Sequence, residues 1–144
     1  DALPISLKIA DINCEAHGVS DRVNLCEGDL LDPLERPCDL IVANLPYIKT
    51  SDISKLAPEI SLYEPRTALD GGEFGTNLIT KLIRSSGSYL KPHGFLVLEI
   101  DPCQAECLIA VAKASFPQSA TALVSDLAGR NRVLRVGPDF PMRF

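Results

Sequence analysis

The sequence lacks several features that would assign it to a class of protein at once. None of its apolar runs approaches the roughly 20 residues that a membrane-spanning helix needs, and no signal peptide opens the chain. It has no cluster of lysine and arginine, and its formal net charge is −5. No phosphate-binding surface is therefore indicated, which disfavours a stand-alone nucleic-acid enzyme. We expect a cytoplasmic protein without membrane contact.

Metal ligation and disulfide bonding are also disfavoured. The five cysteines form no Cys-x-x-Cys pair, and the two histidines lie at no ligand-like spacing from them. This pattern predicts no metal site. Because the cysteines lie among apolar segments, we expect reduced, buried thiols rather than disulfides. With 46% hydrophobic residues in 144, the chain can bury a real core, and we expect one domain over residues 1–144.

The rest of the chain is organised around an apolar run at residues 40–43, which ends in Asn44-Leu45-Pro46-Tyr47. Four successive apolar residues without alternation predict a parallel strand that is buried on both faces. Ligands bind beyond the carboxyl ends of such strands. Asn44 offers a carbonyl acceptor and an NH2 donor, Pro46 stiffens the turn that presents nearby backbone carbonyls, and Tyr47 supplies a flat face. These groups suit a planar substrate NH2 group held against an electrophile, which is the layout needed for N-methylation.

The hydrophobic periodicity of the remaining chain predicts helices and strands in alternation. Such an order favours right-handed crossovers on a parallel sheet, closed by an antiparallel hairpin. In chain order, the expected elements are a helix over 2–17, strands over 23–27 and 40–43, a helix over 76–90 ended by Pro92 and Gly94, a strand over 95–100, a helix capped by Asp101, and a hairpin of 121–125 and 132–136.

A long polar segment, 48–75, follows the motif. A connection of this length is unusual inside a compact domain and is more often functional than idle. It would lie over the same sheet edge as the asparagine of the motif, so we predict that it is a substrate lid. Gly71 and Gly72 would allow close backbone approach or positive φ. Glu59 and Glu64 either orient the entering substrate or pair locally.

The motif and its downstream context resemble a known enzyme family. Asn44-Leu45-Pro46-Tyr47 resembles the Asn-Pro-Pro-Tyr signature of methyltransferases that use S-adenosylmethionine (SAM) to methylate the exocyclic amine of adenine or cytosine, or the side-chain amide of glutamine. Further segments resemble the HemK-like protein-glutamine methyltransferases, which methylate the glutamine of the Gly-Gly-Gln loop of peptide-chain release factors. In order, these segments are Pro58-Glu59-Ile60, Tyr63-Glu64-Pro65, Ala68-Leu69-Asp70-Gly71-Gly72, Leu98-Glu99-Ile100 with Gln104, and Asp126-Leu127-Ala128-Gly129-Arg130 with Arg132.

This resemblance covers essentially the whole chain and implies a fold, a cofactor and a partner. The implied fold is an α/β class I methyltransferase with a Rossmann-like, mostly parallel sheet and a carboxyl-terminal antiparallel hairpin. The implied methyl donor is SAM, with Asp29 and Leu30 beside its adenine and Asn44 also at the cofactor. The implied protein substrate is a release factor. The implied catalytic residues are Asn44, Leu45, Pro46 and Tyr47, and the implied substrate contacts are Asn44, Pro46, Tyr47, Glu59, Glu64, Gly71 and Gly72.

One position departs from the family pattern. Leu45 stands where the glutamine methyltransferases usually carry proline, and Asn-Leu-Pro-Tyr resembles ribosomal RNA adenine dimethyltransferases. Two alternatives therefore remain open. One is a nucleic-acid adenine N6-methyltransferase that stacks a flipped base on Tyr47, and the other is a non-catalytic remnant without a working cofactor site. The block 64–72 has no counterpart in the RNA enzymes, which favours a glutamine side chain as the substrate over adenine.

The family binds SAM largely through a glycine-rich turn after a first strand and an acidic residue after a second, and neither precedes Asp1. We therefore expect an amino-terminally truncated chain that lacks the first strands, binds SAM weakly and is weakly active or inactive alone. Such a chain would leave strand 40–43 with an unpaired edge. An unpaired edge predicts self-association.

Overall fold

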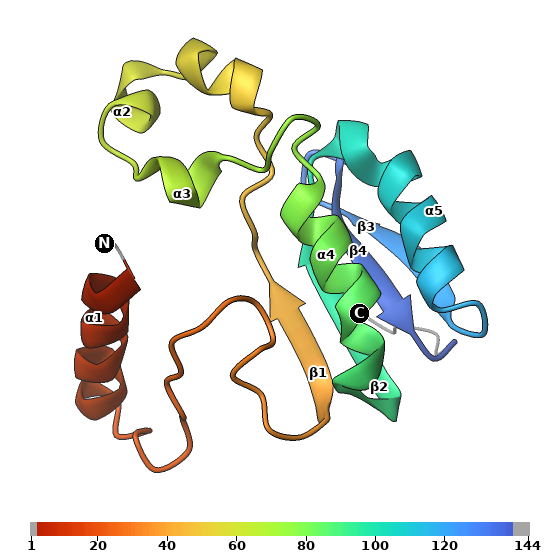
Figure 1. Cartoon of the computed structure of the whole chain (residues 1–144), viewed down its shortest axis with the longest axis horizontal. Coiled ribbons are helices and arrows are strands. Elements are labelled where there is room, and N and C mark those ends of the chain that lie inside the picture. Colours follow the sequence, from red (N-terminus) through yellow and green to blue (C-terminus); the bar gives the residue numbers. More distant parts are fainter. Residues whose placement is uncertain (1–2, 140–144) are drawn as a thin grey trace. The chain divides into compact units, whose positions relative to one another are not determined.

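The computed structural model describes residues 3–139 (Figure 1). The chain divides into two compact units, Asp1–Glu35 and Arg36–Phe144, and each is described by itself. The expectation of one domain over the whole chain stays a prediction.

The first unit contains the predicted amino-terminal helix, α1 (Leu3–Ala16). Gly18 follows the helix with φ +62°, a conformation that glycine adopts readily, so the helix ends where the sequence predicts. Three apolar side chains of this helix, Ile5, Ile9 and Ile12, are 64%, 52% and 58% exposed.

The strand predicted over 23–27 does not form, and that prediction is wrong. Its apolar residues Val23 and Leu25 are 41% and 38% exposed. A strand exists through hydrogen bonds to a neighbouring strand, and the described residues of this unit contain no other strand. The hydrophobic pattern of residues 23–27 alone was therefore not sufficient to form a strand.

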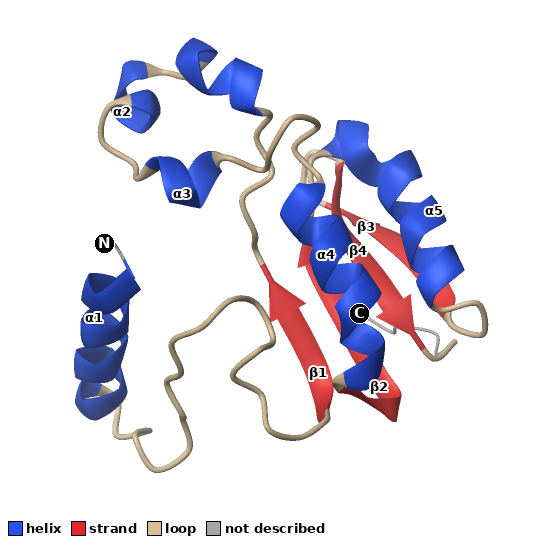
Figure 2. Cartoon of the chain, viewed as in Figure 1, coloured by secondary structure: helices blue, strands red, loops and turns tan. Residues whose placement is uncertain are grey.

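The second unit is a four-stranded sheet with helices on one face, in the spatial order β1-β2-β4-β3. β1 pairs with β2 in parallel, whereas the β2–β4 and β4–β3 pairs are antiparallel, and the sheet ends in the predicted hairpin. The described sheet is therefore mixed rather than mostly parallel as predicted, because both antiparallel pairs involve β4 of that hairpin. Figure 2 shows α4 (Asn77–Ser85) and α5 (Ala105–Ser115) over the same face of the sheet. The strands are β1 (Cys38–Ala43), β2 (Leu90–Glu99), β3 (Ala120–Ser125) and β4 (Asn131–Gly137).

The core lies between these two helices and the sheet. Its helix side chains recur every three or four residues and its strand side chains every second residue, as one-sided burial requires. The most buried members are Ile79, Leu82, Ile83 and Leu108 from the helices, and Leu96, Leu98, Leu134 and Val136 from the strands.

β1 is covered on one face, not on both as its apolar run predicted. Ile41 is 6% exposed, but Leu40 and Val42 are 52% and 68% exposed. β1 also lies at one end of the described sheet, which confirms the unpaired edge. An uninterrupted apolar run therefore did not mean helices on both sides within this chain.

β2 begins earlier than the strand predicted over 95–100, because Pro92 and Gly94 lie inside it rather than ending the preceding helix. The pairing of β2 with β1 shifts its register between Cys38 and Leu40. Proline in a strand is tolerated at such irregularities, where its missing N–H breaks no regular ladder bond. The helix-stop interpretation of these two residues was wrong for this reason.

The exposed edge of β1 leads to a prediction on association. We expect the chain to self-associate at high concentration, and Val42→Lys to weaken the association, because a lysine on an edge strand opposes the addition of another strand. Sedimentation velocity across a concentration series measures the effect. Leu127→Lys makes the same change at a fully exposed turn residue and should behave as the wild-type chain does. A wild-type chain that stays monomeric throughout would contradict the prediction.

Candidate functional site

The Asn44-Leu45-Pro46-Tyr47 segment, called here the 44–47 turn, leaves the sheet at the carboxyl end of β1. Ala43, the last residue of β1, pairs with Leu98 in β2, so the turn begins beside the end of β2. The side chain of Asn44 is exposed, and the described part of the chain contains no hydrogen bond to it. Its amide is thus positioned as predicted, beyond a parallel strand and available to a ligand.

The ring of Tyr47 is half-buried and directed toward the last residue of β2. Its hydroxyl donates to Glu99 Oε1 at 3.4 Å, a long hydrogen bond. Burial raises the pKa of Tyr47, and the negative charge of Glu99 raises it further. Tyr47 therefore remains protonated at neutral pH, and its role as a flat substrate contact stays a prediction.

The 48–75 segment folds back onto the 44–47 turn. It contains η1 (Thr50–Lys55), α2 (Pro58–Ser61) and α3 (Arg66–Leu69). At its far end the Gly71 N–H donates to the Ile48 carbonyl at 2.8 Å. A Cβ on Gly71 would lie 2.7 Å from the Pro46 carbonyl oxygen and 2.8 Å from Tyr47 Cα, closer than packing allows. Glycine is needed at position 71 because its backbone packs directly against the backbone of Pro46 and Tyr47. The role of the 48–75 segment as a substrate lid stays a prediction.

Asp70 holds this returning backbone in place. Its carboxylate accepts hydrogen bonds from Thr50 Oγ1 at 2.6 Å, from the Gly72 N–H at 3.0 Å and from Arg66 Nε at 3.2 Å. The hydrogen bond from Thr50, followed by that from the Gly72 N–H, lowers the pKa of Asp70 below its usual value of 3.8. The sequence showed Asp70 as part of a motif but indicated no role for it. One of its partners, Thr50, lies 20 residues away in the chain, and no local pattern reveals such a contact.

This cluster predicts an acid-dependent loss of stability. Because the pKa of Asp70 is lower in the folded chain, the unfolded chain binds its proton more tightly, so the stabilisation is present above pH 3.8 and is lost as the pH falls through the folded pKa. Asp70→Asn should lower stability at pH 6, and its difference from wild type should shrink as the pH falls below 3.8. Urea unfolding at several pH values measures this difference.

Glu73→Gln is the control for that experiment, because Glu73 is exposed and lies outside the cluster. Glu73→Gln should leave the decrease in the free energy of unfolding at low pH as it is in the wild-type chain. An Asp70→Asn difference that stays constant with pH would contradict the assignment.

The other predicted substrate residues are placed differently. Glu59 and Glu64 are exposed, and in residues 3–139 neither side chain forms an ion pair or a hydrogen bond. Gly72 has φ +89°, and a Cβ there would meet the side chain of Asn77 at 2.2 Å. The structure thus brings Gly71 against the turn and leaves the two glutamates in solvent, where their role in binding stays a prediction.

Asp29 and Leu30, the predicted cofactor contacts, lie in the first unit. Both are at least partly exposed. Leu30 has φ 52° and is the one non-glycine residue with positive φ among the described residues. This conformation is rare for a bulky side chain and marks a locally strained turn, and such turns concentrate at ligand sites.

Gln104 is a site residue whose contacts sequence analysis missed, although it formed part of the resemblance. It ends η3 (Pro102–Gln104), whose start has the predicted Asp101 cap: Asp101 Oδ1 accepts from the Cys103 N–H at 2.9 Å. The Gln104 side chain is 4% exposed and donates to the Tyr47 carbonyl at 2.8 Å. The only local signal was a polar residue at the third position after the cap.

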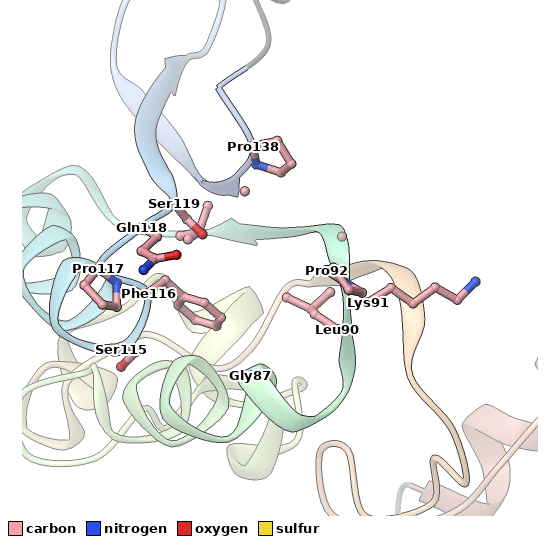
Figure 3. A pocket seen from close by; sticks show the side chains of 13 residues that line it. Gly87, Leu90, Lys91, Pro92, Ser115, Phe116, Pro117, Gln118, Ser119 and Pro138 are labelled. Atoms are coloured by element: carbon pink, nitrogen blue, oxygen red, sulfur yellow. The ribbon is translucent and has the colours of Figure 1, made fainter.

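Two pockets differ in their relation to the turn. One of about 250 Å³ lies beside it. Another of about 390 Å³ (Figure 3) is formed by the amino end of β2, the carboxyl end of β4 and the link between α5 and β3, so it lies at the opposite end of β2 from the turn. The smaller pocket is lined by Tyr47, Ile48, Lys49, Asp52, Leu56, Asp101, Cys103 and Gln104.

Among residues 3–139, no group of histidine, cysteine, aspartate and glutamate side chains could hold a metal ion. The helices of that same range are too short or too polar to cross a membrane.

Comparison with known proteins identifies relatives. No protein-family model matches the chain. The release factor glutamine methyltransferase of Geobacter sulfurreducens is 40% identical over 138 residues, which are 93% of this chain and 47% of that protein. The chain is a relative of the release factor glutamine methyltransferases. The release factor glutamine methyltransferase of Thermodesulfovibrio yellowstonii is 43% identical over 108 residues, which are 74% of this chain and 38% of that protein. The chain spans about half the length of the curated relatives it matches.

Solved structures show the same fold. The ribosomal protein L11 methylase of Lactobacillus delbrueckii subsp. bulgaricus matches with a TM-score of 0.60 at 20% identity, over 94% of this chain and 53% of that one. TrmN of Thermus thermophilus matches with a TM-score of 0.51 at 19% identity, over 92% of this chain and 33% of that one. The fold is that of a class I methyltransferase, as predicted; at these identities the likeness concerns the fold alone.

Proposed function

We propose that the 44–47 turn binds and orients the glutamine of the Gly-Gly-Gln loop of a peptide-chain release factor for methylation of its side-chain amide, with SAM as methyl donor. The observation that carries the proposal is the exposed amide of Asn44 at the carboxyl end of β1, in a relative of the release factor glutamine methyltransferases.

The turn offers a limited set of acceptors for a substrate NH2 group. The Pro46 carbonyl faces the Gly71 backbone, and the Tyr47 carbonyl accepts from Gln104. Among the described residues, no backbone N–H outside the helices and strands donates a hydrogen bond to the Leu45 carbonyl. Asn44 Oδ1 and the Leu45 carbonyl are therefore the pair that takes the two amide hydrogens. Leucine at this position supplies the same carbonyl as the proline of the family pattern.

These acceptors address the main difficulty of the reaction. An amide nitrogen is a poor nucleophile because its lone pair is delocalised into its own carbonyl. Hydrogen bonds from its NH2 to Asn44 and Leu45 strengthen as positive charge develops, so they favour the transition state over the ground state. The Tyr47 ring supports the amide plane. Alignment of the amide nitrogen with the methyl donor as a whole can lower the barrier by about 7 to 11 kcal/mol. As the nitrogen gains the methyl group, the bond between that carbon and the donor sulfur would break, and the sulfur would leave as a neutral thioether. The methylated nitrogen releases one proton to solvent, and no general base is assigned.

SAM supplies a methyl group bonded to a positively charged sulfur. Asp29 fits the role proposed for it, since an exposed carboxylate can accept a hydrogen bond from an adenine amino group. Leu30, with its positive φ, shapes the backbone of that turn.

The test is transfer of labelled methyl from SAM by the product of the complete reading frame that encodes this chain. A purified release factor should become labelled. The control substrate is the same release factor with its Gly-Gly-Gln glutamine replaced by glutamate, which keeps the shape and removes the NH2 group. Equal labelling of both substrates would contradict the proposal.

A further inference from the structure

Gln104 has every polar group of its side chain in use. Its Nε2 donates to the Tyr47 carbonyl at 2.8 Å and to the Gly75 carbonyl at 2.9 Å. Its Oε1 accepts from the Asp101 N–H at 3.2 Å, which completes a capping box. Two carbonyls need a donor and one N–H needs an acceptor, so only one orientation of the amide satisfies all three.

These bonds join three segments that are distant in the sequence. Tyr47 ends the 44–47 turn, Gly75 ends the 48–75 segment, and Asp101 precedes η3 and α5. The junction is tightly packed, since a Cβ on Gly75 would lie 2.4 Å from the Tyr47 carbonyl oxygen and 2.7 Å from Gln104 Nε2. With Gln104 itself 4% exposed, water has little room to replace its amide.

We propose that Gln104 is the positioning residue of the turn. By holding the Tyr47 carbonyl and tying it to Gly75, it keeps the Asn44 side chain and the Leu45 carbonyl directed at the substrate. Gln104 touches neither substrate nor cofactor in this scheme. Its effect on turnover rests on the proposed function, whereas its hold on the turn does not.

The informative substitutions change the donors and little else. Gln104→Met is close in size and removes both donors, which leaves two buried carbonyls without a partner. Gln104→Glu keeps an acceptor for the Asp101 N–H but places an oxygen against the two carbonyls. Protonation of that glutamate restores one donor, so its defect should diminish as the pH falls, and burial moves this protonation to a higher pH than in water.

The first measurement is steady-state methylation of a release factor by the complete reading-frame product. Gln104→Met should lower kcat by about 100-fold, the loss typical of a 1 Å displacement, while KM for SAM stays within about twofold. Gln104→Glu should regain activity on acidification relative to wild type. Leu108→Ala is the stability control, because Leu108 is fully buried on α5 and its side chain has no hydrogen-bond donor to give either carbonyl. At temperatures well below its melting temperature, this variant should keep the wild-type kcat. Unchanged kcat in Gln104→Met would overturn the inference.

The second measurement is hydrogen exchange in this chain, which needs no activity. Gln104→Met should speed exchange of the Ile48, Gly71 and Asn77 amides, which bond within and beside the 48–75 segment, beyond any change in Leu108→Ala. Unchanged exchange would overturn the inference whatever the activity. If the wild-type enzyme labels no release factor, the proposed function fails, and hydrogen exchange alone decides the role of Gln104.

Discussion

Asn44→Ala should lower the turnover of release factor methylation by about 100- to 1000-fold, the range observed when one preorganised transition-state hydrogen bond is removed. The substitution removes the side-chain oxygen that accepts an amide hydrogen as charge develops on the nitrogen. Because the Asn44 side chain is exposed and has no partner in the described part of the chain, stability should change by less than about 0.5 kcal/mol. Steady-state kinetics and thermal unfolding measure the two effects.

Asn44→Asp separates the acceptor role from a donor role. It keeps the side-chain oxygen and removes the NH2 group, so it should retain more activity than Asn44→Ala. SAM affinity, measured by calorimetry on the same proteins, should change little in either variant. Full turnover in Asn44→Ala would refute the assignment of this residue.

Gly75→Ala should lower the free energy of unfolding far more than Gly129→Ala, although the two glycines have nearly the same backbone conformation. Their φ values are +72° and +75°. A Cβ at Gly129 meets nothing within 4 Å, so alanine there should cost about 1 kcal/mol for the conformation alone. At Gly75 the Cβ meets the Tyr47 carbonyl at 2.4 Å and Gln104 Nε2 at 2.7 Å, which raises the expected loss to about 3 kcal/mol.

Urea unfolding of both variants measures this difference, and methylation assays extend it to function. Gly75→Ala should also lose turnover at temperatures where it remains folded, because the new methyl group displaces the Tyr47 carbonyl. Gly129→Ala, in the β3–β4 turn, should keep wild-type turnover. Equal stability losses would contradict the close approach at Gly75.

The parts of the fold that the sequence predicted depend on local signals. The predicted cap at Asp101 gave the start of η3, and the short link between β3 and β4 gave the hairpin. The apolar run before Asn44 gave β1, which ends at Ala43 directly before the motif. Each of these features is determined by residues close together in the chain, and residue type and spacing were sufficient.

The parts that failed depend on distant residues. A strand over 23–27 needed a partner that the described unit does not contain, and Pro92 was accommodated by irregular pairing with β1. The exposed face of β1 could not be foreseen, because an apolar run does not say which neighbours cover it. The bond from Gln104 to Tyr47 joins residues 57 apart, and no periodicity reports such a contact.

The most direct test of the account is to offer labelled SAM to the complete reading-frame product with a release factor and adenine-containing DNA side by side, and to locate the label by mass spectrometry. The account predicts one methyl group on the amide nitrogen of the Gly-Gly-Gln glutamine, lost with Asn44→Ala, and none on DNA. Label on DNA alone would contradict it, and would make Leu45 the decisive residue of the motif.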